Sequence, residues 1–289
     1  MHGKDNMKLT IITINYNNAA GLKKTLDSVA IQTCTDFEHI IVDGASTDNS
    51  VDIIRSYTQV PIANNRKITW LSEPDTGIYN AMNKGVQLAK GEYTLMLNSG
   101  DYLVDEHVVE KVLSLFDGTD IIQGNTIEDI SNKKYRNRGY GKSDIDFFDV
   151  MKGYFLHQAT FCRRDLFDRY GMFDESYKII GDTKFFMTCL GKENASFKYI
   201  DLDVSNYDMT GISAEMHGLW AERRIVEYKR MRSELYSERL NRFFEENDKK
   251  IKLYNQLHQH KWIWYLVMVV AHINNCFYSI IPTTKKERI

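Results

Sequence analysis

Short apolar runs alternate with helical patterns through the first hundred residues. Four runs rich in β-branched and aromatic residues predict buried strands: Leu9–Ile14, Phe37–Val42, Ile68–Leu71 and Tyr93–Leu97. Between the first two runs, apolar side chains recur at helical spacing at Leu22, Leu26 and Val29. Strands that alternate with helices predict an α/β fold, Rossmann-like, with a mixed, mostly parallel sheet flanked by helices.

The helix after the second predicted strand has polar residues at its expected start. Ser46 or Thr47 is expected to cap it, with Asp48 in its first turn. Residues 105–203 continue the mixed pattern. The expected elements there are helices at Val108–Phe116 and Thr183–Leu190, strands at Asp120–Ile127, Ala159–Arg163 and Phe197–Leu202, and a hairpin or loop at Ser131–Gly141.

The last part of the chain has a different character. Residues 214–261 are charged and loosely periodic, which predicts one or two long helices. An apolar run at Trp262–Ala271 is followed by His272, Asn274 and Asn275, so it is interrupted before the roughly 20 residues that a membrane span needs. We therefore expect a helical extension over 214–289, with 262–288 at a membrane surface, buried in the protein, or at a contact between copies in a homodimer.

Composition and charge narrow the possible classes. The chain has 289 residues, 43% of them hydrophobic, with 37 Lys and Arg against 39 Asp and Glu, which excludes intrinsic disorder. Residues 214–289 carry 14 basic and 9 acidic side chains, so the tail is basic and the body acidic. An acidic body without a basic stripe argues against nucleic acid as a partner.

The ends of the chain and its cysteines bear on location. The polar segment Met1–Lys8 leads into an apolar run too short for a signal peptide, so no export signal is predicted. The cysteines Cys34, Cys162, Cys189 and Cys276 are widely spaced, which favours neither a zinc ribbon nor a disulfide framework. We expect a cytoplasmic protein, peripheral at the inner face of the cell membrane if the tail contacts lipid.

Polar side chains follow each of the four predicted strands. The segments are Asn15-Tyr-Asn-Asn18, Asp43-Gly-Ala-Ser-Thr-Asp48, Glu73-Pro-Asp-Thr-Gly77 and Asn98-Ser-Gly-Asp101. Ligands of open parallel sheets bind beyond the carboxyl ends of the strands, where these segments would converge. No dinucleotide, P-loop or nucleophile-elbow motif is present. A rim rich in carboxylates favours phosphates held through Mn²⁺ or Mg²⁺.

Five motifs in order resemble glycosyltransferase family 2, which has the GT-A fold. They are Thr13-Ile-Asn-Tyr-Asn17, Ile41-Val-Asp-Gly-Ala-Ser-Thr-Asp48, Glu73-Pro-Asp-Thr-Gly-Ile-Tyr-Asn-Ala-Met-Asn-Lys-Gly85, Gly91-Glu-Tyr-Thr-Leu-Met-Leu-Asn-Ser-Gly-Asp101 and His157-Gln-Ala-Thr-Phe161. The resemblance covers about residues 7–205. It implies a catalytic domain over 1–213, with a nucleotide-sugar half at about 7–103 and an acceptor half at about 104–213.

The resemblance also implies an activity and a set of site residues. The activity is inverting, metal-dependent transfer of a sugar from a nucleotide diphosphate, UDP above all, to an acceptor hydroxyl. Asp182 matches the catalytic base, Asp101 the metal ligand, and His157 and Gln158 the sugar and acceptor cleft. The implied nucleotide-sugar contacts are Thr13, Asn15, Tyr16, Asn17, Asp43, Asp75, Gly77, Asn83, Asn98, Ser99 and Gly100, with Asp43 accepting a hydrogen bond from the base.

The sequence departs from the family pattern at three positions. The usual acid-rich segment is Asn98-Ser99-Gly100-Asp101 here, which leaves a single carboxylate. Gly181 replaces the usual glutamate before the base, and Met82 stands where arginine is common. One carboxylate can still hold a cation whose other ligands are diphosphate oxygens and water.

Other interpretations stay open at this point. Asp43 and Asp48 could serve only as helix caps, Asp101 as a turn residue, and His157 as an interior histidine. A sugar-1-phosphate nucleotidyltransferase shares the doubly wound sheet, although Asn15–Asn18 lacks the basic glycine-rich loop expected of it. A non-catalytic scaffold that binds nucleotide sugars is the second alternative. The favoured interpretation is a glycosyltransferase acting on a saccharide or lipid-linked saccharide in polysaccharide or glycolipid assembly.

Overall fold

The fold is known from a computed structural model that describes residues 7–59, 67–130, 133–209 and 218–242. The chain divides into two compact units, Met1–Met231 and Arg232–Ile289, and the sheet and both cavities described below belong to the first. The boundary expected at residue 213 stays a prediction. The apolar run at Trp262–Ala271 lies outside the described residues. Within the described part of the chain, no helix is long and apolar enough to cross a membrane.

One mixed sheet organises the first unit. The strands are β1 (Leu9–Asn15), β2 (Phe37–Asp43), β3 (Lys67–Ser72), β4 (Tyr93–Met96), β5 (Tyr102–Leu103), β6 (Ile121–Ile130), β7 (Lys133–Asn137), β8 (Thr160–Arg163) and β9 (Phe197–Tyr207). Their order is β3-β2-β1-β4-β8-β6-β9-β5, with β7 beside β6. The four strands predicted from the apolar runs are confirmed. They are parallel, whereas β8 is antiparallel to both of its neighbours.

The order of the strands reverses at β1. From β1 the chain proceeds outward through β2 to β3 and then returns to form β4 on the other side of β1. The carboxyl ends of β1 and β4 therefore lead their loops apart, which leaves room for a ligand between them. The predicted polar segments after β1 and after β4 lie side by side at this reversal, where Asn18 Nδ2 donates to the backbone oxygen of Ser99 at 3.1 Å.

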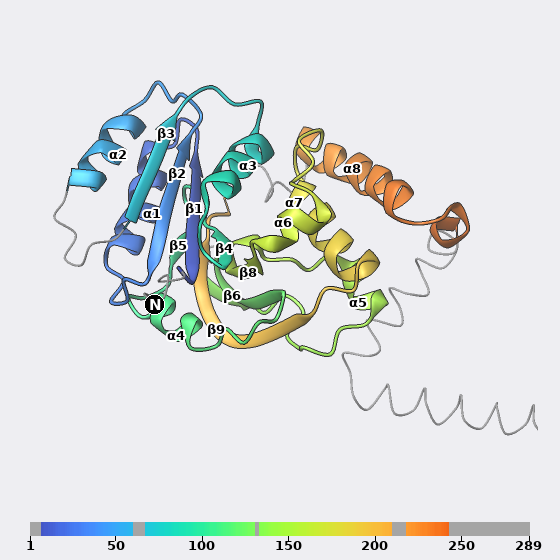
Figure 1. Ribbon diagram of the computed structural model, residues 1–289. Helices are drawn as coiled ribbons and strands as arrows, with labels where there is room; N and C mark the ends of the chain where they lie inside the picture. The colour runs from blue at the N-terminus through green and yellow to red at the C-terminus, as the bar shows by residue number, and fades with distance from the viewer. Residues whose placement is uncertain (1–6, 60–66, 131–132, 210–217, 243–289) are drawn as a thin grey trace, which may run out of the picture. The chain divides into compact units, whose positions relative to one another are not determined.

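Helices cover both faces of the parallel part of the sheet (Figure 1). On one face, α1 (Ala19–Ala30) and α2 (Ser50–Gln59) pack on β2, with Leu22, Ile41 and Ile54 in one cluster. On the other face, α3 (Ile78–Leu88) lies so close to β1 that a methyl group at Gly85 would collide with Ile12. Alternate residues of each strand thus face opposite layers of helices, as the continuous apolar runs predicted.

The remaining helices belong to the second half of the unit. They are α4 (Val108–Leu113), α5 (Phe147–Lys152), α6 (Asp165–Tyr170), α7 (Gly181–Met187) and α8 (Leu219–Leu235), together with a 3₁₀ turn at His157–Ala159 and a π turn at Thr188–Lys192. The segment Ser131–Gly141 contributes β7, which pairs with β6 as a hairpin strand. The long strand β9 pairs with β6 and β5 and returns the chain to the carboxyl end of β4.

The start expected for the second helix is wrong. α2 begins at Ser50, not at Ser46 or Thr47. Ser46 Oγ donates to Asp43 and accepts from Asn15 Nδ2 and Asn17 N, so it is not available as a cap. The Thr47 hydroxyl donates to Asn17 Oδ1. Asp48 accepts instead from the backbone N–H groups of Ser50 and Ala19, and so holds the starts of α2 and α1 together.

The buried carboxylate of Asp43 joins three strands at their carboxyl ends. Its Oδ1 accepts from Asn15 Nδ2 (2.8 Å) and Ser46 Oγ (2.6 Å), and its Oδ2 accepts from Ser46 N (2.9 Å) and Ser72 Oγ (2.7 Å). Burial raises the pKa of this carboxyl group, but the hydrogen bonds from Ser46, Ser72 and Asn15 outweigh burial and lower it. Asp43 is therefore stable as an anion inside the fold.

We expect Asp43→Ala to lower the free energy of unfolding by about 3 kcal/mol at pH 7, because it leaves buried donors without an acceptor. The folded pKa is depressed, so the contribution is present above the unfolded value of about 4 and is lost as the pH falls through the folded value. Denaturant titrations between pH 7 and pH 3 measure this difference. The matched control is Asp36→Ala, at an exposed carboxylate just before β2. Equal effects of the two substitutions would contradict the assignment.

Candidate active site

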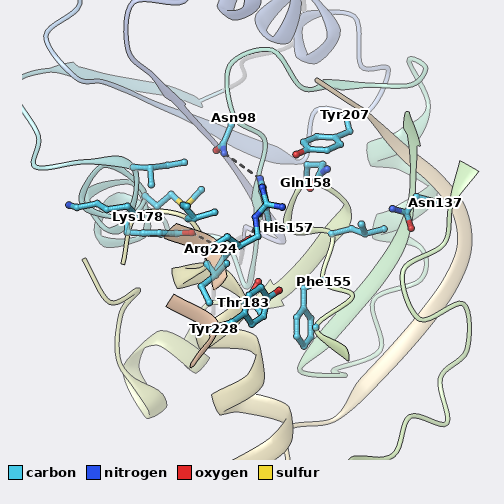
Figure 2. Close-up of a pocket in the computed structure, with 18 of the residues that line it drawn as sticks. Asn98, Asn137, Phe155, His157, Gln158, Lys178, Thr183, Tyr207, Arg224 and Tyr228 are labelled. Atoms are coloured by element: carbon cyan, nitrogen blue, oxygen red, sulfur yellow. Dashed lines mark hydrogen bonds and ion pairs between the residues drawn. The ribbon is translucent and has the colours of Figure 1, made fainter. Parts of the chain in front are cut away.

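Two adjoining cavities lie at the carboxyl ends of the central strands. The larger, of about 540 Å³, is at the reversal between β1 and β4, and the smaller, of about 280 Å³, is next to it under α7 and α8. Four residues line both cavities: Ile78, Asn98, His157 and Tyr207. The two cavities therefore meet at the Asn98 and His157 side chains, which point toward each other in Figure 2.

The larger cavity gathers most of the residues predicted to bind the donor or a metal ion. It is lined by Asn15, Tyr16, Asp75, Gly77, Asn98, Ser99 and Asp101. Tyr16 is 66% exposed, so its ring offers an aromatic surface at the edge of the cavity. These residues come from three of the four polar segments, which confirms that the loops after β1, β3 and β4 converge.

Other predicted donor contacts line neither cavity. Thr13 bonds to His39, and Asn83 both donates to and accepts from the backbone of Phe173. Asn17 forms hydrogen bonds with Ser46 and Thr47. Asp43 accepts from Ser46. Gly100 lies against the carboxylate of Asp208. Direct contact of the donor with Thr13, Asn17, Asp43, Asn83 and Gly100 stays a prediction.

Asp101 is buried in the wall of the larger cavity, at 4% exposure. Its Oδ1 accepts one hydrogen bond, from the backbone N of Asp208 at 2.8 Å. Burial raises the pKa of Asp101 to about 6, because desolvation penalises the anion. A nearby cation would offset that penalty.

A second carboxylate, which sequence analysis missed, lies beside Asp101. Asp208 follows the end of β9 and lines the same cavity. A side chain at Gly100 would collide with the Asp208 carboxylate, and Gly100 also has a φ of 109°, so only glycine fits there. Sequence analysis missed Asp208 because it ends the predicted strand at Leu202, whereas β9 continues to Tyr207 and places Asp208 directly after a strand, like the other polar residues.

The two carboxylates suit a divalent cation. No group of three or more metal-ligating side chains occurs among the described residues. Asp101 and Asp208 nevertheless match the one or two carboxylates by which proteins usually hold Mg²⁺, the other ligands being phosphate oxygens and water. The residues present thus fit a cation that arrives with a diphosphate.

The smaller cavity contains Asp182, His157 and Gln158, the residues predicted for catalysis and for the acceptor cleft. Asp182 lies in the first turn of α7 and accepts two side-chain hydrogen bonds, from Tyr79 (3.0 Å, to Oδ1) and from His157 Nδ1 (3.1 Å, to Oδ2). His157 Nε2 lies 3.3 Å from Asn98 Nδ2. A continuous row of hydrogen-bonded side chains therefore runs from Tyr79 through Asp182 and His157 to Asn98. It connects α3 and the loop after β4 with α7 and the turn before β8.

Gly181 has a packing role. The ring of Tyr79 lies against it, and a Cβ at this position would be 2.7 Å from a ring carbon. The glutamate that the family resemblance implies before the base would displace that ring. Tyr79 occupies the space instead and donates its hydroxyl to Asp182.

The segment before Asp182 is fixed by Glu227 of α8, the second residue that sequence analysis missed. The Glu227 carboxylate is 6% exposed and accepts from the backbone N–H groups of Lys178 (2.8 Å), Ile179 (3.0 Å) and Ile180 (3.2 Å). Arg223 also donates to it, at 3.2 Å. The same helix contributes Arg224 and Tyr228 to the smaller cavity.

Comparison with known proteins identifies the class. The model of glycosyl transferase family 2 matches residues 10–173, and the chain belongs to this family. It is 33% identical over 205 residues to a PGL/p-HBAD biosynthesis glycosyltransferase of Mycobacterium bovis, a match that covers 70% of this chain and 77% of the relative. The chain is therefore a glycosyltransferase.

Solved structures share the fold. S. aureus TarS 1–349 in complex with UDP superposes with a TM-score of 0.58 at 22% identity, covering 70% of this chain and 60% of that one. The mannosyltransferase PcManGT from Pyrobaculum calidifontis, in complex with GDP-Man and Mn²⁺, superposes with a TM-score of 0.56 at 19% identity, covering 76% of this chain and 62% of that one. The GT-A fold expected from the sequence is confirmed.

We expect Glu227→Ala to destabilise the protein by about 2 kcal/mol and to loosen the segment before Asp182, because three buried N–H groups lose their acceptor. Hydrogen exchange followed by mass spectrometry should show faster exchange in a peptide that covers residues 178–180. The matched control is Glu222→Ala, at an exposed position on the same helix. Unchanged exchange at 178–180 in Glu227→Ala would refute the anchoring role.

Proposed function

We propose that this glycosyltransferase moves a sugar from a nucleoside diphosphate donor to an acceptor hydroxyl with inversion at the anomeric carbon. The observation that carries the proposal is the junction of the two cavities. One cavity holds the carboxylates Asp101 and Asp208, and the other holds Asp182 with its hydrogen-bonded partners. A donor in the first cavity and an acceptor in the second would meet beside His157.

UDP is the nucleotide that we favour. Two solved structures with the same fold support a nucleotide sugar as the donor: TarS in complex with UDP-GlcNAc, and PcManGT in complex with GDP-Man and Mn²⁺. In our proposal the base lies by Tyr16 and Asp75, and the diphosphate lies between Ser99 and Asp101. A hydrogen bond from the nucleotide base to Asp43 would have to replace one of the bonds that Asp43 now accepts, such as those from Asn15 and Ser72.

The cation would be held by Asp101 and Asp208. When bound, Mn²⁺ or Mg²⁺ neutralises the charge that develops on the departing diphosphate. The protein contributes the position of the two carboxylates, which the hydrogen bond from Asp208 N to Asp101 fixes relative to each other. Burial raises the pKa of Asp101 to about 6, so a bound cation would supply the stabilisation that the buried anion lacks.

General base catalysis would come from Asp182. In the simplest form of the mechanism, Asp182 takes the proton of the acceptor hydroxyl while the oxygen attacks the anomeric carbon on the face opposite the diphosphate. A single in-line displacement inverts the configuration. The row from Tyr79 to Asn98 holds the carboxylate in place for this step.

The sequence and the names of the relatives together support a proposal for the acceptor class. The mycobacterial relatives are named for PGL/p-HBAD biosynthesis. We propose a saccharide or lipid-linked saccharide acceptor, with the enzyme peripheral at the inner face of the membrane through residues 262–288. A contact between copies is the other use of that segment. A nucleotidyltransferase is now disfavoured by the family membership, and a non-catalytic scaffold is an outcome of the tests below.

A thermal-shift panel of UDP, GDP, dTDP and CDP, each with and without Mn²⁺, tests the donor and the cation together. A ligand at a hundredfold excess over its Kd stabilises the folded state by about 2.7 kcal/mol. We expect a shift with UDP that requires Mn²⁺ and disappears in both Asp101→Ala and Asp208→Ala. Asp52→Ala on the exposed surface of α2 serves as the control. A metal-independent shift would contradict the cation site, and no shift with any nucleotide would contradict the donor site. A shift in a wild-type protein that shows no turnover would favour a scaffold.

Replacement of Asp182 by Asn should reduce transfer at least 100-fold while the donor-induced thermal shift stays, because an amide cannot accept the proton or stabilise a positive charge. Release of nucleoside diphosphate, measured with the donor that the panel identifies, follows the reaction. Full turnover by Asp182→Asn would contradict a mechanism that depends on the Asp182 carboxylate. Loss of the thermal shift as well would mean that Asp182 supports the fold of the donor site.

A further inference from the structure

We propose that Nε2 of His157 is the atom that takes the proton from the acceptor hydroxyl, with Asp182 as its orienting partner. This inference rests on the proposed function and changes the part that Asp182 plays in it. The two residues would form a dyad in which the carboxylate fixes the imidazole and the imidazole meets the substrate.

The carboxylate of Asp182 is already engaged. Each oxygen accepts a side-chain hydrogen bond, and the side chain is only 13% exposed. Burial alone would raise its pKa, but the hydrogen bond and charge of His157, with donors from Thr183 and Tyr79, hold the pKa below the usual value. A carboxylate stabilised in this way as an anion is a weak base.

The hydrogen bond to Asp182 fixes the tautomer of His157. An ionised carboxylate only accepts, so Nδ1 must carry the proton that it donates across 3.1 Å. The lone pair of the neutral ring is therefore on Nε2. At 3.3 Å, the hydrogen bond from Asn98 Nδ2 to Nε2 is long, so an incoming hydroxyl can replace it.

His157 also has the better position for proton transfer. It lines both cavities, whereas Asp182 lines only the smaller one. The reacting hydroxyl must lie against the anomeric carbon, at the junction between donor and acceptor. Nε2, which faces Asn98 at that junction, is therefore closer to the reaction than the carboxylate behind it.

The charge around the ring supports an imidazolium. The charged residues that line the two cavities are Asp75, Asp101, Glu128, Lys178, Asp182, Asp208 and Arg224. Burial alone would lower the pKa of His157, but the pKa is raised overall, above all by the hydrogen bond and charge of Asp182. A base works best when its pKa is near the working pH, and the dyad moves His157 in that direction.

The step balances without a further reactant. The hydroxyl proton passes to Nε2, and the oxygen forms a bond to the anomeric carbon. The bond from that carbon to the diphosphate oxygen breaks, and its electron pair leaves with the diphosphate. The imidazolium then holds one proton, paired with the Asp182 carboxylate, and releases it to water after the products leave.

The first test uses the protein alone and needs no substrate. Nitrogen-15 NMR of histidine-labelled protein reports which ring nitrogen carries the proton, and His157→Gln identifies the His157 signals among the eight histidines. We expect the Nδ1–H tautomer in the wild type and its loss in Asp182→Ala. A wild-type Nε2–H tautomer would overturn the proposal, because Nε2 would have no lone pair to accept a proton.

The second test is chemical rescue. UDP-N-acetylglucosamine and GDP-mannose serve as probes, and release of the nucleoside diphosphate is measured with and without 100 mM imidazole or formate. We expect His157→Ala to lower the rate at least 100-fold and imidazole to restore it at least tenfold. Asp182→Ala should not respond to imidazole. His107→Ala, at an exposed histidine before α4, is the matched control and should behave as the wild type.

The two tests separate the possible failures. If formate rescues Asp182→Ala and imidazole fails to rescue His157→Ala, Asp182 is the base and the dyad proposal is wrong. The same conclusion follows if His157→Ala keeps more than a tenth of the wild-type rate. If the wild type neither binds nor turns over either probe, the result counts against the proposed function, while the tautomer still decides whether Nε2 is available as a base.

Discussion

The position of Asp182 depends on hydrogen bonds from separate parts of the fold, and the geometry of the site depends on Asp182. Tyr79 reaches it from α3 on the nucleotide-sugar side, and His157 reaches it from the turn before β8. Behind it, Glu227 of α8 fixes the three residues that lead into α7. Because each donor comes from a different element, the two cavities keep their relative position only when all of these elements are packed.

Asp43, Asp182 and Asp101 differ in the number and kind of their hydrogen-bond donors, and the difference separates structure from function. Asp43 accepts from four donors and is stabilised as an anion within the sheet. Asp182 accepts from a tyrosine and a histidine in the reaction cavity. Asp101 accepts one backbone hydrogen bond, and burial raises its pKa to about 6. A buried carboxylate with so few donors lacks the compensation that a cation would provide.

The sequence predicted what depends on local periodicity and missed what depends on distant contacts. The first four strands and the convergence of the loops after β1, β3 and β4 followed from apolar runs and from the rule for parallel sheets. Asp208 and Glu227 reach the site only through the pairing of β9 and the packing of α8, which no local pattern encodes. The start of α2 was misplaced because the Ser46 hydroxyl bonds to Asp43, a contact that competes with capping.

The structure explains how the segment Asn98–Asp101 can serve the site with a single carboxylate. Asp208 supplies a second carboxylate beside Asp101, so acids missing from the sequence motif need not be missing from the site. Asn98 stands where the family pattern has an acid, and it faces Nε2 of His157. A carboxylate there would pair with the imidazole from the other side and favour a proton on Nε2, which would remove the lone pair that a base needs. A neutral amide at this position keeps Nε2 able to accept a proton.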